Sequence, residues 1–240
     1  MIWEKEIECA GRKKIEEIQL ERLKHSVTKA YENVPFYKQK FDEMGIKPSD
    51  IKSLKDIQKL PFTTKTDMRD QYPFGLFAEP MKNIVRVHAS SGTTGKPVVA
   101  GYTRSDLNNW STAIARIVSA AGVSEEDIAQ VAFGYGLFTG GFGLHYGMEK
   151  VGTTIVPMSS GNTQKQIMLM QDFGTTALIA TPSYAMYISE VIEEMGLPKS
   201  NFKLKYGLFG SEGMSEEMRS TLEKRFGALV TTNYGLTEVM

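Results

Sequence analysis

The sequence predicts an α/β fold, a largely parallel and helix-covered sheet with a helical N-terminal lead-in. Up to residue 83, apolar residues recur at helical spacing within a polar sequence, whereas from residue 84 short β-branched or apolar runs alternate with helical periods. From Ile128 onward strands and helices alternate strictly, which favours parallel strands joined by right-handed crossovers. We therefore divide the chain into a helical lead-in region, residues 1–83, and an α/β part, residues 84–240.

The lead-in region contains one long amphipathic helical pattern. Its apolar residues near one helical face are Ile15, Ile18, Leu23, Val27, Ala30 and Tyr31. Pro35 closes this segment, and "SLKD" (Ser53 to Asp56) has the capping-box pattern of another short helix. The remaining Lys and Glu residues are typical of a solvated face, so we expect no chemistry here.

The α/β part resolves into seven extended runs and five helical segments. The runs are IVRVHA (84–89), VVAGYT (98–103), IAQVAF (128–133), TTIVPM (153–158), TALIAT (176–181), LKYGLF (204–209) and ALVTTN (228–233). A capping box at Thr103–Asp106 predicts a helix that Gly122 ends. Further helices are predicted around 140–151, 163–173, 182–195 and 215–226, with Ser215 as a cap and Gly174, Gly196 and Gly227 as stops.

Composition excludes several classes of protein. The 240 residues are 41% hydrophobic and 23% charged, typical of a globular domain, and 28 basic residues balance 28 acidic ones. A neutral chain is not drawn as a whole to nucleic acid or anionic lipid. Cys9 is the only cysteine, the histidines lack zinc-site spacing, and neither a signal peptide nor an apolar run of about 20 residues is present. We expect a cytoplasmic protein with no nucleic-acid or membrane partner.

Unusual residues follow each of the last five predicted strands. These stretches are GYGLFTGG (134–141), SSGNT (159–163), TPSY (181–184), GSEG (210–213) and NYGLTE (233–238). The carboxyl ends of parallel strands share one edge of the sheet, where ligands bind. Polar, glycine-rich loops are common, but aromatic, acidic and hydroxyl residues recur here, which favours a binding site.

The stretch "SSGTTGKP" (90–97) joins two predicted strands. It is not a Walker A loop, since Ser90 stands where that pattern needs glycine and Pro97 where it needs Ser or Thr. Its glycines permit backbone N–H groups to form an anion-binding nest, its hydroxyls add donors, and Lys96 adds a positive charge. The alternatives are a phosphate-binding loop and a plain hairpin tip.

Two of these motifs resemble signatures of the adenylate-forming superfamily. "SSGTTGKP" is similar to its phosphate loop and "NYGLTE" to its aromatic–Gly–x–Thr–Glu run, in the same order and roughly 140 residues apart. Together with "FGYGLFTGG", "TPSY" and "YGLTEVM", they closely resemble phenylacetate–coenzyme A ligases, and the likeness extends to the last residue. It implies an incomplete large domain of an adenylate-forming enzyme, with the C-terminal lid domain absent.

The resemblance implies a role for each motif residue. The residues that would bind ATP are Ser90, Ser91, Gly92, Thr93, Thr94, Gly95, Lys96, Ser211, Glu212, Gly213, Asn233, Tyr234, Gly235 and Thr237. Lys96 and its loop would cover the β- and γ-phosphates, and Tyr234 would flank adenine. Thr237 would contact the α-phosphate or the acid, and Glu238 would hold Mg²⁺, a hard cation that suits a carboxylate. Lys96, Thr237 and Glu238 are the implied catalytic residues; without the motif, Glu238 would be a solvated loop acid.

The same resemblance assigns the acid-binding residues. Tyr135 and Phe138 would lie beside an aromatic ring, with Gly140 and Gly141 leaving room, although both aromatics could equally be core residues. Glu149 and Lys150 are expected to be surface charges. The chain reads "GSEGM" at 210–214 where the family often has Gly-Ala-Glu-Pro-Trp, so Glu212 is kept while the proline and the aromatic residue are replaced by Gly213 and Met214.

The implied activity is that of an AMP-forming aryl-CoA ligase, which uses ATP, Mg²⁺, coenzyme A and a small aryl acid. Two alternatives remain open: a relative that adenylylates another acceptor, such as a deazaflavin, and a non-catalytic nucleotide-binding module. The family's ribose-binding aspartate and lid lysine belong to a part absent from these residues. We expect this chain alone to be weakly active or inactive, and its last strand to be covered in a homodimer or by a missing C-terminal polypeptide.

Overall fold

The computed structural model describes residues 1–90 and 95–238 and divides the chain into two compact units. The N-terminal unit comprises Glu4–Ser105, and the sheet unit comprises Asp106–Met240 together with Met1–Trp3. Each is considered by itself. The N-terminal unit ends at Ser105, because the hairpin of β1 and β2 belongs to it. The change of pattern in the sequence lies earlier, at residue 84. The assignment of residues 84–240 as one ligand-binding part stays a prediction.

The N-terminal unit is mainly helical. Its elements are α1 (Lys5–Glu8), α2 (Arg12–Asn33), α3 (Pro35–Glu43), η1 (Pro48–Asp50), η2 (Leu54–Lys59), α4 (Lys65–Asp70), η3 (Met81–Asn83) and the antiparallel strands β1 (Arg86–Ala89) and β2 (Val99–Tyr102). Pro35 closes α2, as predicted, and it also begins α3, where a missing N–H costs nothing. The "SLKD" capping box is present, but it starts a 3₁₀ helix. A small core forms around Val27, Phe41 and Ile51.

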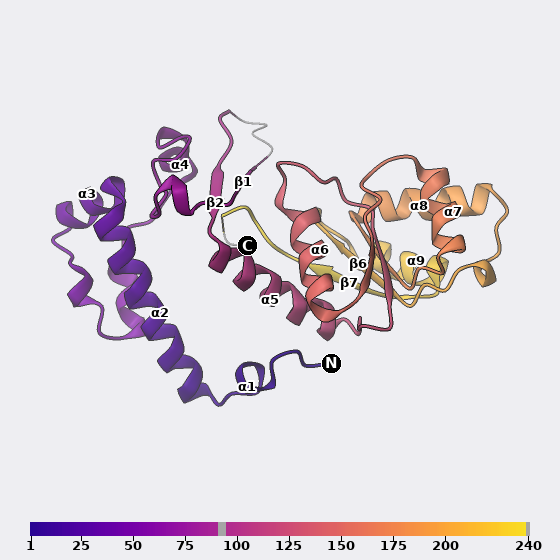
Figure 1. Cartoon of the computed structure of the whole chain (residues 1–240), viewed down its shortest axis with the longest axis horizontal. Helices are drawn as coiled ribbons and strands as arrows, with labels where there is room; N and C mark the ends of the chain where they lie inside the picture. Colours follow the sequence, from indigo (N-terminus) through magenta and orange to yellow (C-terminus); the bar gives the residue numbers. More distant parts are fainter. Residues whose placement is uncertain (91–94, 239–240) are drawn as a thin grey trace. The chain divides into compact units, whose positions relative to one another are not determined.

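The sheet unit is the predicted parallel α/β sheet (Figure 1). Its elements are α5 (Arg104–Ala120, which begins two residues before the unit), β3 (Ile128–Val131), α6 (Thr139–Val151), β4 (Thr154–Val156), α7 (Thr163–Asp172), β5 (Ala177–Ala180), α8 (Pro182–Glu194), η4 (Lys199–Asn201), β6 (Tyr206–Gly210), α9 (Glu216–Phe226) and β7 (Leu229–Asn233). The strand order is β4-β3-β5-β6-β7, and every neighbouring pair is parallel. β4 is shorter than predicted because Pro157 has no N–H to donate to a ladder.

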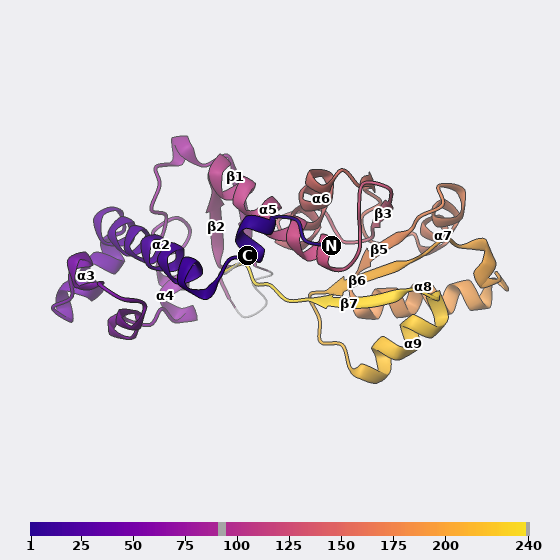
Figure 2. The same ribbon diagram turned by 90° about the horizontal axis from the view of Figure 1, so that it is seen from below.

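Helices cover both faces of this sheet. Residues of α5 and α6 form one buried cluster with β3 and β5, and residues of α7, α8 and α9 form another on the opposite face. Figure 2 shows α8 and α9 beneath the strands. The chain therefore reverses its direction across the sheet after β4, which places a topological switch point between β3 and β5. The crevice at such a point is where open α/β sheets bind ligands.

Four of the predicted helix signals are confirmed. The Ser215 hydroxyl accepts a hydrogen bond from the Met218 N–H and so caps α9. Gly174, Gly196 and Gly227 follow α7, α8 and α9 with φ values of +63°, +65° and +68°, a conformation that favours glycine. These local rules position the loops that carry the candidate site.

Candidate functional site

The loops that follow β3 to β7 leave the same edge of the sheet, as the sequence predicted. Within residues 1–90 and 95–238, three non-glycine residues have a left-handed backbone: Ser159 (φ +63°), Asn162 (+48°) and Ser211 (+71°). All three lie in these loops. Such conformations cost of order 1–3 kcal/mol and gather where function requires them. No pattern in the sequence predicts these three conformations.

The loop after β6 is joined to the loop after β5 by Glu212. Its carboxylate accepts a hydrogen bond from the Ser183 N–H at 3.2 Å, in the first turn of α8. The Thr181 hydroxyl caps this helix by accepting from the Tyr184 N–H at 3.3 Å. A carboxylate is stabilised at a helix N-terminus, so Glu212 holds two of the predicted loops in register. A Cβ on Gly213, beside it, would have no other atom within 4 Å.

The end of β7 packs closely against the end of β6. A Cβ on Gly210 would lie 2.8 Å from the Asn233 backbone oxygen, so only glycine fits there. The Oδ1 atom of Asn233 is buried and has no hydrogen-bond partner among the described residues. Next to it, Tyr234 is 84% exposed. Gly235 and Glu238 are also exposed, and Thr237 is half-buried. This strand end therefore combines a buried acceptor that has no partner among the described residues with an uncovered aromatic face.

The loop after β3 holds Tyr135 and Phe138. The Tyr135 hydroxyl lies 3.1 Å from His145 Nδ1, and its ring meets the edge of Phe142 at 5.3 Å between centroids. Phe138 is 41% exposed. A Cβ on Gly140 would lie 2.5 Å from the Phe138 ring, and one on Gly141 would lie 2.8 Å from the Gly134 carbonyl oxygen. Both glycines thus leave room for neighbouring protein atoms, and their contact with a substrate stays a prediction.

A buried amide network supports the loop after β4. Gln166 on α7 is fully buried, and its Nε2 donates to the Ser159 carbonyl at 2.6 Å. Its Oε1 accepts from Gln130 Nε2 at 2.6 Å, and Gln130 accepts in turn from the Thr175 hydroxyl at 3.3 Å. The patterns in the sequence do not predict this network. Its only sequence signal is a polar Gln130 within an otherwise apolar strand.

The predicted phosphate loop belongs to the N-terminal unit, between β1 and β2. The Ser90 N–H donates to the Val98 carbonyl and the Ser90 hydroxyl accepts from the Val98 N–H, both at 2.9 Å, which closes the hairpin. Gly95 has a φ of +132°, and Lys96 Nζ lies 5.4 Å from the centre of the Tyr72 ring, a cation–π distance. Ser91, Gly92, Thr93 and Thr94 lie outside the described residues. This hairpin and the β6 and β7 loops belong to different units, so their assembly into one site stays a prediction.

A comparison with protein families decides what kind of protein this is. The family described as "AMP-binding enzyme" matches residues 18–240. The chain belongs to the AMP-binding enzyme family. This confirms the superfamily that the "SSGTTGKP" and "NYGLTE" motifs indicated.

Members of this family with curated names are similar over nearly the whole chain. It is 51% identical over 234 residues to a phenylacetate-coenzyme A ligase of Aromatoleum evansii and 48% identical over 235 residues to one of Escherichia coli strain K12. Each alignment covers 98% of this chain but only 53% and 54% of the relative. The chain thus spans about half the length of the curated relatives it matches.

Solved structures of AMP-binding family members confirm the fold. A 2-hydroxyisobutyryl-CoA ligase in complex with 2-HIB-AMP and CoA superposes with a TM-score of 0.89 at 31% identity, over 95% of this chain and 50% of that one. The same ligase with R3-HIB-AMP gives 0.89 at 29% identity. An amide bond synthetase from Marinactinospora thermotolerans, 18% identical with a TM-score of 0.53, shares the fold alone.

The residues of this family member suit Mg²⁺ only in company with phosphate. Among residues 1–90 and 95–238, no three His, Cys, Asp or Glu side chains lie together as a metal cage. Mg²⁺ usually takes one or two carboxylates and completes its shell with phosphate oxygens and water. Glu238 is exposed, and its role as a ligand of a nucleotide-bound cation stays a prediction. Within the same described residues, no helix has both the length and the apolar composition that crossing a bilayer requires.

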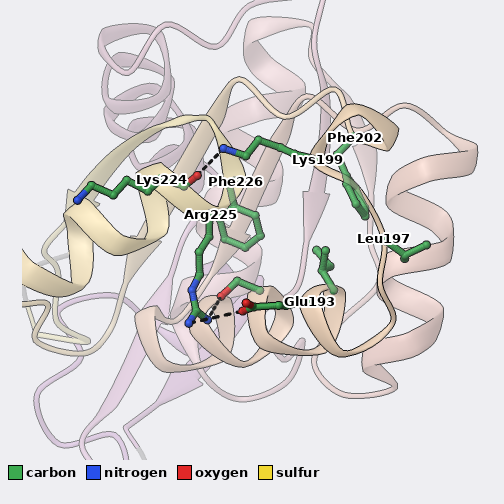
Figure 3. A pocket seen from close by; sticks show the side chains of 9 residues that line it. Glu193, Leu197, Lys199, Phe202, Lys224, Arg225 and Phe226 are labelled. Atoms are coloured by element: carbon green, nitrogen blue, oxygen red, sulfur yellow. Dashed lines mark hydrogen bonds and ion pairs between the residues drawn. The ribbon is translucent and has the colours of Figure 1, made fainter.

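A pocket of about 300 Å³ lies away from these loops, between the C-terminal ends of α8 and α9 (Figure 3). Its two central cations are engaged. Lys199 Nζ donates to the Lys224 carbonyl at 2.5 Å, and Arg225 donates to the Ser189 hydroxyl at 3.1 Å and lies 3.8 Å from the Glu193 carboxylate. We assign no ligand to this pocket, since its charges serve to join the two helices.

Proposed function

We propose that the chain forms part of an AMP-forming aryl-CoA ligase. This enzyme would activate phenylacetate or a similar aryl acid with ATP to an acyl-adenylate and pyrophosphate, and then transfer the acyl group to coenzyme A. The observation that carries the proposal is the 45–51% identity, over nearly all of this chain, to curated proteins named phenylacetate-coenzyme A ligase. Ligase complexes with an acyl-adenylate and CoA on the same fold support it.

The chemistry asks chiefly for positioning and charge neutralisation. An acid oxygen attacks the α-phosphorus of ATP, the bond to the bridging oxygen breaks, and pyrophosphate leaves. Both reactants are anionic, so a preorganised cationic and hydrogen-bonding site lowers the barrier. We assign Lys96, Ser90 and the intervening loop to the β- and γ-phosphates, and Thr237 to the α-phosphate or the acid. The Mg²⁺ that Glu238 would hold neutralises phosphate charge when bound.

The adenine end of the nucleotide is assigned to the β6 and β7 loops. The exposed Tyr234 ring offers a stacking face, and the buried Oδ1 of Asn233 offers an acceptor for an amino group. Ser211, Glu212, Gly213 and Gly235 would line the rest of this subsite. Tyr135 and Phe138 would flank the aryl group, beside Gly140 and Gly141. In the second step the CoA thiol attacks the acyl carbon, and AMP leaves.

Calorimetric titration of the chain tests this proposal. We expect Mg·ATP to bind weakly and a nonhydrolysable phenylacetyl-adenylate analogue to bind more tightly. Lys96→Ala and Glu238→Gln should each weaken nucleotide binding by roughly 10- to 100-fold, the loss expected for a charge-assisted contact. The matched controls are Lys82→Ala and Glu217→Gln, exposed residues of the same charges on η3 and α9. A chain that binds neither ligand would contradict the proposal and favour a non-nucleotide role.

Acid-dependent pyrophosphate exchange separates the proposal from its enzymatic alternative. In a protein of the relatives' full length, phenylacetate should stimulate exchange between ATP and labelled pyrophosphate. Exchange that needs another acceptor, such as a deazaflavin, would favour the alternative. Nucleotide binding without any exchange would favour a non-catalytic module.

A further inference from the structure

Tyr135 takes part in a hydrogen-bonded chain that extends onto α6. Its hydroxyl lies 3.1 Å from His145 Nδ1, and His145 Nε2 lies 3.1 Å from the carboxylate of Glu149. His145 and Glu149 are four residues apart on one helix, the spacing at which side chains on a helical surface meet. The imidazole is mostly covered, with 19% of its side chain exposed, whereas Glu149 is 52% exposed.

Which group donates in each of these hydrogen bonds follows from the chemistry of the carboxylate and the phenol. An ionised carboxylate can only accept, so a neutral His145 carries its proton on Nε2 and donates it to Glu149. Nδ1 is then an acceptor, and Tyr135 donates its hydroxyl proton to it. Glu149 thereby selects the tautomer that receives Tyr135. Burial, reinforced by the charge of Glu149 and by Tyr146, raises the pKa of Tyr135 to about 12, so the phenol keeps its proton near neutral pH.

α6 holds His145 and Glu149 firmly in place because two of its glycines let it pack closely against α5. A Cβ on Gly143 would lie 2.6 Å from the Trp110 ring, and one on Gly147 would lie 2.2 Å from the Ile114 side chain. Both glycines are buried. The helix that carries His145 and Glu149 is therefore held by close packing, which limits how far either side chain can move with it.

The backbone of Tyr135 is held by the loop after β4. Its N–H donates to the Ser159 hydroxyl at 3.4 Å, and the Ser159 carbonyl accepts from the fully buried Gln166 at 2.6 Å. Tyr135 is thus fixed at its backbone by the loop after β4 and at its hydroxyl by α6. The edges of Phe142 and His145, at 5.3 and 5.7 Å between ring centres, complete its surroundings.

We propose that His145 is a positioning residue, oriented by Glu149, that locks the Tyr135 side chain so that its ring and not its hydroxyl proton is available to the aryl acid. The inference about the acid rests on the proposed function. The locking of Tyr135 does not, because it concerns contacts within this chain alone. Neither His145 nor Glu149 needs to touch the substrate, so their effect is on orientation and on selectivity for an aromatic acid.

Nuclear magnetic resonance of the chain tests the lock without any ligand. Imidazole ¹⁵N shifts give the His145 tautomer, and Tyr135→Phe identifies the Tyr135 signals. His145→Phe keeps a ring but removes the acceptor, whereas His145→Asn can place an amide oxygen near the position of Nδ1. Lys150→Gln is the matched control, since it breaks a 2.7 Å hydrogen bond from the same helix to Asn108.

We expect His145 to carry its proton on Nε2 in the unaltered chain and to show a mixture of tautomers in Glu149→Gln. The Tyr135 ring signals should broaden or shift in His145→Phe and stay close to their original positions in His145→Asn and Lys150→Gln. A proton on Nδ1, or Tyr135 signals that neither shift nor broaden in His145→Phe, would overturn the proposal. Should His145→Phe fail to fold, the position of the His145 proton in the unaltered chain and in Glu149→Gln still decides it.

Titration with two acyl-adenylate analogues tests the consequence for selectivity. His145→Phe should lower the affinity for the phenylacetyl analogue by roughly 3- to 10-fold, the effect of losing one hydrogen bond. It should leave the affinity for the acetyl analogue unchanged. His145→Asn should restore the aryl affinity. Equal losses for both analogues would mean a general structural role and would overturn the selectivity inference. If the unaltered chain binds neither analogue, the proposed function fails, while the resonance data still decide the lock.

Discussion

At the scale of single residues, we expect Asn233 to contribute to nucleotide binding but little to the stability of the folded chain. A buried acceptor without a partner costs about 1–3 kcal/mol in a folded protein, so the free chain gains little from Asn233 Oδ1. We predict that Asn233→Ala weakens nucleotide binding by roughly 3- to 10-fold. It should lower the free energy of unfolding by no more than about 1 kcal/mol, because no made hydrogen bond to Oδ1 is lost. Calorimetry and urea unfolding measure the two effects. Thr232→Ala, exposed on the same strand, is the control, and a large loss of stability with full binding would contradict the prediction.

Asp127 is a buried acid that stabilises the turn before β3. Its side chain is 3% exposed and accepts from the Ser124 N–H and hydroxyl at 2.9 and 3.1 Å. Burial alone would raise the pKa of Asp127, but hydrogen bonds from Ser124 and Thr176 and the charge of Lys205 outweigh it and hold the pKa below its usual value. A carboxyl with a lowered folded pKa stabilises the protein above its unfolded pKa, about 3.9, and less as the pH falls through the folded value.

We therefore predict a pH-dependent effect of Asp127→Asn. At pH 7 the variant should lose about 1–3 kcal/mol of unfolding free energy. The gap between variant and unaltered chain should narrow as the pH falls below about 4. Urea unfolding at both pH values measures it, with the exposed Asp172→Asn as control. A gap that stays constant down to pH 3 would show that charge plays no part.

At the scale of elements, the contact between α5 and α6 depends on the absence of two side chains. We predict that Gly147→Ala destabilises the chain by about 1–3 kcal/mol, since the new Cβ would lie 2.2 Å from Ile114 and force the helices apart. Gly136→Ala, which meets open space, should cost much less. Thermal unfolding compares the two. Equal effects would mean that the packing between these helices is loose.

Element types were predictable from the sequence because their causes are local. The strands begin and end within about two residues of their predicted runs, and Ser215, Gly174, Gly196 and Gly227 act as predicted. Strand order was not predictable, because pairing of β3 with both β4 and β5 depends on packing between distant segments. The site divides in the same way. Its motif residues were visible in the sequence, whereas the Tyr135–His145–Glu149 chain required a strand end and a helix face to be placed together.

At the scale of the whole molecule, the two motifs that resemble nucleotide-binding signatures lie in two different compact units, and the chain spans about half the length of the curated relatives it matches. The resemblance to phenylacetate–coenzyme A ligases implies that the ribose-binding aspartate and the lid lysine lie in the part of those relatives that these 240 residues do not match. We predict that the 240-residue polypeptide by itself forms phenylacetyl-CoA at a negligible rate, because the groups that complete the reaction are needed as a set. A thioester assay, with the Escherichia coli ligase as positive control, measures this. A rate typical of that enzyme would contradict the prediction.

The central claim of the proposed function is that Ser90 and Lys96 contact the phosphates of ATP and that the loops after β6 and β7 contact its adenine. A crystal structure of the chain with a nonhydrolysable ATP analogue tests it most directly. We predict phosphate oxygens beside Lys96 and Ser90, and adenine against the Tyr234 ring with its amino group at Asn233. Nucleotide bound at the far edge, in the pocket between α8 and α9, or nowhere on the molecule, would contradict the claim.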